Sequence, residues 1–380
     1  MKVIVLGAGL VGVPMALDLA KDPRIEVCTA DIQEASLARL SKTRAVSTLQ
    51  EDLSDAACIR KIVSGFDMVI NALPGRIGFQ TLKSVIEAGK NVVDIAFFPE
   101  DPFDLDKLAK EKEVTAVVDC GVSPGMSNVL AGYASNLLDK TDIISLYVGG
   151  LPEKKAGPLE FKALFSLSDL LEVYTRPARV MENGVIVTKA ALSDLEQIDF
   201  ADVGPLEAFC TDGLRTLIKT IDCPNMKEKT LRYPGHIEKI QFLIDCGLLS
   251  HDTVDLDGAE LRPIDLTAKV LSHVMRLEPG EKDITVMRLI VEGRKDQKKI
   301  RYTFELLDKY DETTGVHSMG RTTGYAAAAV ARMIASGIYT QKGISPPEYI
   351  GRKKECVDFL LKEMSDRRVI YTESLEETEC

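Results

Sequence analysis

The sequence predicts an α/β fold in which a doubly wound parallel sheet is followed by a second, α+β domain. Three observations lead to this prediction. Strand-like apolar runs alternate with helical patterns from Met1 to about Gly121, a patterned glycine loop follows the first of these runs, and the regular alternation stops after Gly121. At 380 residues the chain is also long enough to divide into two domains.

Six runs are predicted as strands because they carry apolar residues at consecutive positions, as parallel strands covered on both faces must. They are Lys2–Leu6, Ile25–Ala30, Ala45–Leu49, Met68–Ala72, Val92–Ile95 and Thr115–Asp119. The helical patterns between them are Val13–Lys21, Gln33–Lys42, Asp55–Val63, Phe79–Ala88 and Asp104–Glu113. This alternation is typical of a Rossmann-type sheet with helices on both faces.

The pattern changes after the sixth strand. Met126–Leu138 is predicted as a long helix, Ile143–Gly149 as a strand, and residues 151–320 as strands and short helices interrupted by proline and glycine. Thr322–Ser336 is predicted as an alanine-rich helix whose small side chains suit close packing against the first domain. The acidic tail Glu373–Cys380 is expected to fray.

The charge balance argues against a nucleic acid or an anionic membrane as the main partner, because the formal net charge is −11. The basic stretch Arg294–Arg301 is interpreted as the solvated tip of a hairpin, since strand-like runs flank Asp296 and Gln297 at its centre. No run of eighteen apolar residues occurs that could span a membrane. The N-terminal apolar run resembles a signal peptide, but Asp18 interrupts it, so we expect a cytoplasmic protein.

The cysteines give no sign of a metal site. No two of them form a Cys-x-x-Cys pair, and none lies at metal-ligand spacing from a histidine. The eight are Cys28, Cys58, Cys120, Cys210, Cys223, Cys246, Cys356 and Cys380. We expect reduced thiols, as in a cytosolic protein, and no bound metal.

The loop Gly7–Gly12 has the Gly-x-Gly-x-x-Gly pattern directly after a strand and at the start of an amphipathic helix. In this context Gly7 permits the tight turn, Gly9 lets the backbone approach a diphosphate, and Gly12 lets the helix pack on the strand. Leu10 and Val11 lie between them, and the helix N-terminus would hold the diphosphate. The loop predicts a dinucleotide-binding site.

Asp31 ends the second strand about twenty residues beyond this loop, where a carboxylate accepts both hydroxyls of the adenine ribose. A carboxylate there repels a 2′-phosphate, and no arginine follows directly, so we expect NAD rather than NADP. The competing interpretation is an ordinary glycine turn and an exposed Asp. Further cofactor-binding candidates lie after the third and fourth strands: Asp52, Asn71, Ala72, Leu73 and Pro74. For the last four, a plain strand-to-helix turn is the alternative.

A second loop, Val118–Met126, begins at the carboxyl end of the sixth strand, where ligands bind in open α/β sheets. Gly121 and Pro124-Gly125 are expected to shape a tight loop whose amides point into the crevice. Asp119 could hold an amine substrate or a water, or it could only cap the loop. Cys120 could be reactive, although the apolar residues before it favour burial.

At these loops the chain resembles the saccharopine dehydrogenase family, and matching stretches follow one another along nearly the whole sequence. They are Gly7–Gly12, Ala72–Gly75, Val117–Asn128, Tyr147–Pro152, Tyr174–Ala178, Leu206–Phe209, Asp212–Arg215, Leu231–Lys239, Arg321–Tyr325 and Pro346–Glu348. The resemblance implies a Rossmann domain, a mixed-sheet second domain, use of NAD and a homodimer. We therefore expect a dinucleotide-binding Rossmann domain over residues 1–125, an α+β substrate-binding and dimerisation domain over 126–320, and C-terminal helices over 321–380 that pack back on the Rossmann domain.

The resemblance also implies a reaction, the oxidative deamination of the ε-carbon of L-lysine to a semialdehyde that cyclises to Δ1-piperideine-6-carboxylate. Such chemistry needs a neutral ε-amine, a carboxylate for the α-ammonium group, and a cation or helix N-terminus for the α-carboxylate. Asp119 and His236 are the catalytic candidates, His236 because an unperturbed histidine titrates near neutrality. The substrate-binding candidates are Glu100, Ser123, Tyr147, Glu207, Arg215, Arg321 and Thr322.

Each candidate has a competing interpretation. A histidine in a turn is more often structural than catalytic, and Glu207, Arg215 and Arg321 could form interdomain or dimer ion pairs instead. His251, His273 and His317 have no supporting neighbours and are interpreted as structural. Saccharopine-forming reductase activity and carboxynorspermidine dehydrogenase activity are alternatives that commonly use NADP, against which Asp31 counts. A non-catalytic NAD-binding protein is a third alternative.

Overall fold

The computed structural model describes residues 1–41, 43, 45–278 and 280–379, and the chain divides into two compact units. The first unit contains Met1–Asp139 and Met319–Tyr371, and the second contains Lys140–Ser318 and the residues from Thr372 onward. These boundaries differ from the expected ones at two places. The helix after residue 125 belongs to the first unit, and the end of the chain belongs to the second.

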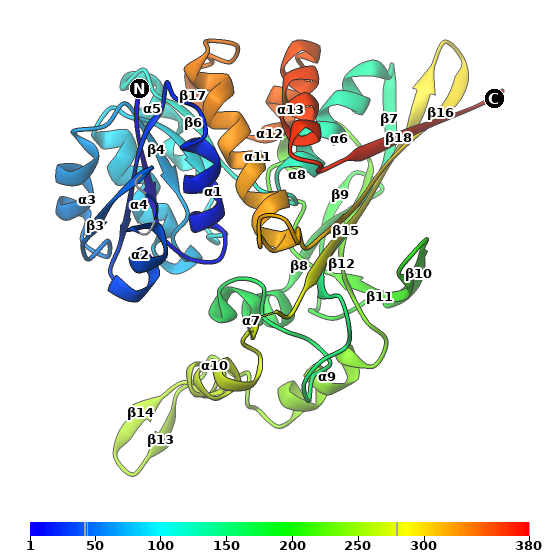
Figure 1. The fold of residues 1–380 in the computed structure, drawn as a ribbon. Coiled ribbons are helices and arrows are strands. Elements are labelled where there is room, and N and C mark those ends of the chain that lie inside the picture. The colour runs from blue at the N-terminus through cyan, green and yellow to red at the C-terminus, as the bar shows by residue number, and fades with distance from the viewer. Residues whose placement is uncertain (42, 44, 279, 380) are drawn as a thin grey trace. The chain divides into compact units, whose positions relative to one another are not determined.

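The first unit is built on a seven-stranded parallel sheet with the order β17-β6-β5-β4-β1-β2-β3 (Figure 1). This confirms the predicted doubly wound sheet. Its strands are β1 (Lys2–Leu6), β2 (Glu26–Asp31), β3 (Val46–Gln50), β4 (Met68–Asn71), β5 (Asn91–Asp94), β6 (Thr115–Val117) and β17 (Gly343–Ser345). The six predicted strands are all present within two residues, and β17 is an addition from the C-terminal part of the chain.

The helices of this unit follow the predicted alternation, with one 3-10 turn. They are α1 (Gly12–Leu19), α2 (Glu34–Ser41), α3 (Ala56–Val63), α4 (Gly75–Glu87), η1 (Pro102–Leu105), α5 (Asp106–Glu111) and α6 (Met126–Leu137). Local chemistry sets their ends: Asp55, for example, accepts the N–H groups of Ala57 and Cys58 at 3.0 and 3.2 Å and so begins α3. Lys42, the predicted end of the second helix, lies outside the described residues.

The C-terminal segment completes this unit through α11 (Ser318–Ala335), α12 (Pro347–Gly351) and α13 (Lys354–Asp366). Asp18 of α1 is buried, and its carboxylate accepts from Arg332 of α11 at 2.9 Å and from Arg367, after α13, at 2.8 Å. Strand β17 pairs with β6 in the same unit. The C-terminal segment therefore contacts α1 through Arg332 and Arg367 and adds a strand to the sheet of this unit.

The second unit contains a nine-stranded mixed sheet whose main path is β10-β11-β12-β7-β15-β16-β18, with β8 beside β12 and β9 beside β8. These strands are β7 (Lys140–Pro152), β8 (Ala178–Glu182), β9 (Val185–Lys189), β10 (Glu196–Phe200), β11 (Gly204–Cys210), β12 (Asn225–Arg232), β15 (Asp283–Lys295), β16 (Lys298–Lys309) and β18 (Tyr371–Glu379). A small hairpin, β13 (Val254–Leu256) with β14 (Ala259–Leu261), and four helices complete the unit. The helices are α7 (Leu167–Thr175), α8 (Leu217–Thr220), α9 (His236–Asp245) and α10 (Pro263–Val274).

One prediction in this unit is confirmed and one is wrong. The basic stretch does form a hairpin tip, because Asp296 and Gln297 adopt positive φ values of 49° and 63° between β15 and β16. The acidic tail does not fray over its described part: it is the edge strand β18, and Glu377 pairs with Lys298 of β16 at 3.0 Å. Pairing with a basic strand holds the acidic segment in place. Cys380 lies outside the described residues.

Two further findings concern the described part of the chain as a whole. None of its helices is both long and apolar enough to cross a membrane. Within the same residues, no group of three or more His, Cys, Asp or Glu side chains is arranged to hold a metal ion.

Candidate functional site

The glycine loop after β1 has the close contacts that only glycine allows. Gly7 has a φ of +107°, and a Cβ on it would lie 2.6 Å from the carbonyl oxygen of Ala72. A Cβ on Gly12 would lie 2.1 Å from the carbonyl oxygen of Gly7. A Cβ on Gly9, by contrast, would have no atom within 4 Å. Gly7 and Gly12 are therefore needed for packing, whereas Gly9 keeps a space open at the surface of the loop.

The N-terminus of α1 at this loop carries no competing anion. Val11 makes no side-chain capping hydrogen bond, and the first turn has no acidic residue. Leu10 and Val11 are half-buried, and their carbonyl oxygens lie beneath α11, 3.0 and 3.1 Å from where a Cβ on Gly320 or Gly324 would be. Free amides and the positive end of the helix dipole suit a diphosphate. These residues therefore fit a dinucleotide.

Asp31 is held in place by backbone groups. Its Oδ2 accepts the N–H of Ala8 at 2.7 Å and its Oδ1 accepts the N–H of Gln33 at 2.7 Å. The carboxylate thus stands at the end of β2 directly beside the glycine loop, and each oxygen keeps a lone pair for another donor. Glu34, the first residue of α2, adds a second negative charge nearby in the chain. Asp52 is exposed, and the N–H of Ser54 lowers the pKa of its carboxyl group.

Asn71 lies at the end of β4 and is fully buried. Its Nδ2 donates to Asp94 at 2.7 Å, and its Oδ1 accepts the N–H of Leu73 at 3.3 Å. The side chain therefore shapes the turn Ala72–Pro74, and Pro74 is the N-cap residue of α4. If a cofactor binds here, residues Ala72–Pro74 would contact it and the side-chain amide of Asn71 would not.

The loop after β6 corrects one expectation. The N–H of Gly121 donates to the carbonyl of Pro124 at 2.9 Å, and that of Gly125 donates to the Oδ1 of Asn128 at 3.2 Å. These two amides are therefore used in local hydrogen bonds. The turn is also tight, since a Cβ on Gly125 would lie 1.9 Å from the carbonyl oxygen of Gly121. Asp119 is buried with a positive φ of 51°.

Cys120 is buried, as the residues before it indicated. Burial, and then the nearby carboxylates of Asp94 and Asp119, raise the pKa of its thiol far above the ordinary range. A thiolate is the reactive form, so this cysteine is inert. Two other candidates of the first unit are more accessible: Ser123 is half-buried and accepts from Ser127 Oγ at 3.1 Å, and Glu100 is exposed.

Arg321 has a role that the sequence did not suggest. Its Nη2 donates to the carbonyl oxygens of Arg367 and Arg368 at 3.0 and 3.4 Å, just beyond the end of α13. The side chain is buried, and its neighbour Thr322 is fully buried. These contacts place the Nη2 of Arg321 at the C-terminal end of a helix within the first unit.

His236 is placed in the core of the second unit. Its Nδ1 lies 2.8 Å from the carbonyl oxygen of Leu159, and its Nε2 lies 2.9 Å from the hydroxyl of Tyr174. Burial, together with the charge of Arg232, lowers the pKa of His236 to about 3. Both ring nitrogens are thus occupied and the ring is neutral, so this geometry favours the structural role over proton transfer.

The remaining candidates belong to the same unit. Tyr147 on β7 is buried under the ammonium group of Lys227, which lies 5.3 Å from the ring centroid, and burial raises the pKa of its phenol. Arg215 is buried with a positive φ of 51°. Glu207 on β11 accepts the N–H of Gly235, the N-cap residue of α9, at 3.3 Å.

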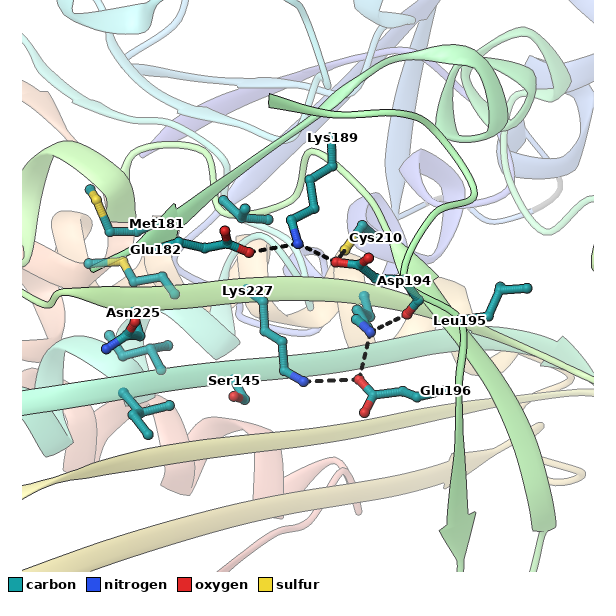
Figure 2. Close-up of a pocket in the computed structure, with 15 residues that line it drawn as sticks. Ser145, Met181, Glu182, Lys189, Asp194, Leu195, Glu196, Cys210, Asn225 and Lys227 are labelled. Atoms are coloured by element: carbon teal, nitrogen blue, oxygen red, sulfur yellow. Dashed lines mark hydrogen bonds and ion pairs between the residues drawn. The ribbon is translucent and has the colours of Figure 1, made fainter. Parts of the chain in front are cut away.

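A cavity of about 460 Å³ lies on the mixed sheet of the second unit. Figure 2 shows its lysines pointing at carboxylates: Lys189 pairs with Glu182 at 2.6 Å and with Asp194, and Lys227 pairs with Glu196 at 3.0 Å. Lys229 pairs with the same Glu196 at 2.8 Å. Each cation already has an acidic partner, so the cavity offers no spare positive charge. Sequence analysis did not identify it, because its residues come from six strands and one loop that are separate in the sequence.

The chain matches two domain profiles of one family. Residues 3–117 match the saccharopine dehydrogenase NADP binding domain, and residues 121–370 match the saccharopine dehydrogenase C-terminal domain. Among solved structures, apo saccharopine dehydrogenase (L-Glu forming) from Saccharomyces cerevisiae aligns with a TM-score of 0.80 and 20% identity over 99% of both chains. That similarity shows the shared fold.

Curated relatives agree in family but are distant in sequence. Saccharopine dehydrogenase [NADP(+), L-glutamate-forming] of S. cerevisiae is 22% identical over 97% of this chain and 98% of its own length. Mitochondrial alpha-aminoadipic semialdehyde synthase of Bos taurus is 22% identical over 98% of this chain, which spans only 47% of that protein. Carboxynorspermidine synthase of Vibrio cholerae is 22% identical over 90% of this chain and 91% of its own length. With both of its domains matched, this chain belongs to the saccharopine dehydrogenase family.

Proposed function

We propose that this protein is an NAD-dependent L-lysine 6-dehydrogenase. The observation that carries the proposal is the arrangement of the glycine loop and Asp31, a carboxylate fixed at 2.7 Å from the Ala8 N–H of the same loop. This arrangement supports a dinucleotide whose adenine ribose carries free hydroxyls. When bound, the nicotinamide supplies the oxidant of the reaction, a hydride acceptor.

We propose NAD over NADP although the matched family domain is an NADP binding domain and the yeast relative is named as an NADP(+) enzyme. It rests on charge. A 2′-phosphate placed beside Asp31 would meet a carboxylate, and the next residues along the chain are Ile32, Gln33 and Glu34, none of them basic. Like charges at hydrogen-bonding distance repel, whereas two ribose hydroxyls can each donate to the carboxylate.

The proposed reaction converts lysine, water and NAD to a semialdehyde, ammonia and NADH. The ε-carbon of lysine, bearing a neutral amine, loses a hydride to NAD, and the ε-nitrogen loses a proton to solvent, which gives an imine. Water adds to the imine carbon and ammonia leaves, which gives the semialdehyde that cyclises to Δ1-piperideine-6-carboxylate. The residue that takes the proton from the ε-ammonium group is proposed to be Asp119, which lies two residues after β6.

Lysine is preferred over saccharopine because saccharopine carries an additional, glutamate-derived dicarboxylate that needs several cations, and the cations named next are already bonded to other groups. The cavity lysines are paired with carboxylates, and Arg321 is bonded to helix-end carbonyls. The alignment with the yeast enzyme also runs over 445 positions, more than the 380 residues of this chain, so that enzyme carries segments without a counterpart here. A homodimer and a cytoplasmic location are also proposed, and light scattering and cell fractionation test them.

The test mixes purified protein with L-lysine and either NAD or NADP at neutral to alkaline pH and follows the absorbance of the reduced cofactor. We expect reduction of NAD with lysine. Saccharopine and carboxynorspermidine are tested in parallel with both cofactors. Reduction with one of these two but not with lysine would replace the proposed substrate, and the absence of reduction with all three would support a non-catalytic NAD-binding protein.

A further inference from the structure

Arg232, at the end of β12, is a buried cation that forms no ion pair within the described residues, although its charge acts on buried Glu228 of the same strand. Its side chain is 3% exposed, and within the described residues no carboxylate oxygen comes within 4.0 Å of its guanidinium. Other arginines of this protein are paired: Arg179 with Asp212 at 2.8 Å, and Arg288 with Glu305 at 2.6 Å. Removing a cation from water costs several kcal/mol unless an anion compensates it, so an unpaired buried arginine requires an explanation.

Neutral groups hold this guanidinium in one orientation. Its Nε donates to the hydroxyl of Tyr174 at 2.9 Å and its Nη1 donates to the carbonyl oxygen of Leu231 at 2.8 Å. The guanidinium carbon lies 4.4 Å from the ring centroid of Phe161 and 5.5 Å from that of Tyr174. Its Nη2 has no hydrogen-bond partner in the described part of the chain, although it is not fully enclosed. One edge of the cation is therefore left for a ligand.

His236 and Tyr174 orient Arg232 without adding a second charge to the site. Because Tyr174 accepts from Arg232, its own proton is directed to the Nε2 of His236, and the Nδ1 of His236 donates to the carbonyl oxygen of Leu159. The tyrosine and the histidine are both neutral in this chain of hydrogen bonds. The cluster therefore carries a single charge, on Arg232, and the neutral histidine positions the tyrosine that positions the arginine.

Glu207 provides an opposite charge on the same face of the sheet. It stands directly across from Arg232 in the antiparallel pairing of β11 with β12, so both side chains point to one side. Glu207 is half-buried, and its carboxylate accepts the N–H of Gly235 instead of pairing with the arginine. The two charges are thus adjacent but separate, and each can bind a group of the opposite sign.

We propose that Arg232 and Glu207 form a head-group site for an α-amino acid, in which Arg232 binds the α-carboxylate and Glu207 binds the α-ammonium group. The inference rests on the proposed function only in taking L-lysine as the amino acid. It assigns substrate recognition to an arginine other than Arg215 and Arg321. Charge-assisted hydrogen bonds of this kind are roughly twice as strong as neutral ones. Tyr174, Phe161 and His236 are positioning residues.

The experiment measures equilibrium binding by calorimetry to the full-length protein saturated with NADH, so that no turnover occurs. Two probes each lack one group of lysine: cadaverine lacks the carboxylate, and 6-aminohexanoate lacks the α-amine. We expect the wild-type protein to bind lysine more tightly than either probe. Arg232→Gln should weaken lysine about 10- to 100-fold and leave cadaverine unchanged, because only lysine presents a carboxylate to the lost cation.

Glu207→Gln provides a second, milder variant, since its amide oxygen still accepts the N–H of Gly235. It should weaken lysine about tenfold and leave 6-aminohexanoate unchanged. The matched control is Arg288→Gln, which removes an arginine that also lies over a ring, 4.5 Å from Phe200, but that has an acidic partner. This control should leave all three affinities unchanged. If Arg232→Gln folds poorly, Arg232→Lys takes its place in the experiment. Because it keeps the positive charge, it should retain part of the lysine affinity.

The outcomes separate this inference from the proposed function. If lysine binds as predicted but is not oxidised, the head-group site stands and the proposed reaction fails. If lysine is oxidised while Arg232→Gln and Glu207→Gln change all three affinities equally or not at all, the head-group site is wrong and Arg232 is only a packing residue. If the wild-type protein binds cadaverine as tightly as lysine, the inference is likewise overturned.

Discussion

Asp31 in the first unit and Arg232 in the second unit differ in what holds them. The Asp31 carboxylate accepts two backbone N–H groups, one from the glycine loop and one two residues further along the chain. The guanidinium of Arg232 is held by the hydroxyl of Tyr174, 58 residues away, and by the rings of Phe161 and Tyr174. A site built on backbone groups is encoded locally, whereas a site built from distant side chains depends on the complete fold.

Two buried charges of this protein, Asp18 and Arg232, differ in whether they form ion pairs. Asp18 is buried with its arginine partners, and such a group contributes to stability. Arg232 is buried without an ion-pair partner among the described residues, and we propose that it binds a ligand. Substitutions at these and related positions should therefore have different effects on stability and on binding.

The largest expected effect on stability is at Asp18. Replacing it with alanine removes the more buried of the two carboxylates that Arg332 and Arg367 share and leaves only Glu363, 3.4 and 3.0 Å away. Breaking a buried ion pair costs up to about 3–5 kcal/mol of unfolding free energy. Urea denaturation measures this loss. The control is Asp22→Ala, which removes the pair with the exposed Arg24 and should cost no more than about 1 kcal/mol. Equal losses for both variants would contradict the role of Asp18 in joining α1 to the C-terminal helices.

Two substitutions in the glycine loop should have different effects, one on the stability of the fold and the other on NAD affinity. Gly12→Ala places a methyl group 2.1 Å from the carbonyl oxygen of Gly7, so it should destabilise the fold by about 1–3 kcal/mol or more. Gly9→Ala meets no atom within 4 Å and should keep the wild-type melting temperature. The same methyl group would occupy the space toward the diphosphate, so Gly9→Ala should weaken NAD binding at least tenfold. A Gly9→Ala protein that binds NAD normally would show that the diphosphate lies elsewhere.

Glu228 on β12 should give the second unit a pH dependence. Burial raises the pKa of this carboxyl group from 4.5 to about 7, although the hydroxyl of Thr211 and the N–H of Gly213 donate to it. A raised folded-state pKa contributes stability that is fully present below about pH 4.5 and is lost as the pH rises through about 7.

The variant Glu228→Gln does not ionise, so it should lose less stability than the wild-type protein between pH 5 and pH 8, by about 1–3 kcal/mol. Thermal unfolding at the two pH values measures the difference. The exposed Glu238 on α9 offers the control, since Glu238→Gln should follow the wild-type profile. Parallel profiles for Glu228→Gln and the wild type would show that Glu228 does not titrate in this range.

The smallest effect concerns cofactor choice. Asp31→Ala removes the proposed acceptor of the ribose hydroxyls, so NAD affinity should fall about tenfold and the preference over NADP should shrink. Fluorescence titration with NADH and NADPH measures both. The control is Asp55→Ala, which removes the N-cap of α3 and costs about 1 kcal/mol of unfolding free energy. It should leave the affinities for NADH and NADPH unchanged. Unchanged NADH affinity in Asp31→Ala would overturn the ribose contact.

The sequence allowed the first unit to be predicted almost completely, because parallel strands and the glycine loop have local signatures. It did not reveal β17, which is only three residues long, or β18, whose acidic residues are typical of a mobile tail until the basic β16 lies beside them. In the second unit the prediction singled out His236 by residue type and passed over Arg232, four residues before it. Burial and hydrogen-bond partners decide their roles, and neither can be read from one segment of sequence.

The central claim is that lysine is oxidised at its ε-carbon with NAD. The most direct measurement supplies L-lysine labelled with ¹⁵N at the ε-position, together with NAD, and follows the label in released ammonia alongside the reduced cofactor. We expect one labelled ammonia for each NADH formed. Ammonia without the label, NADH formed without ammonia, or reduction of NADP alone would contradict it.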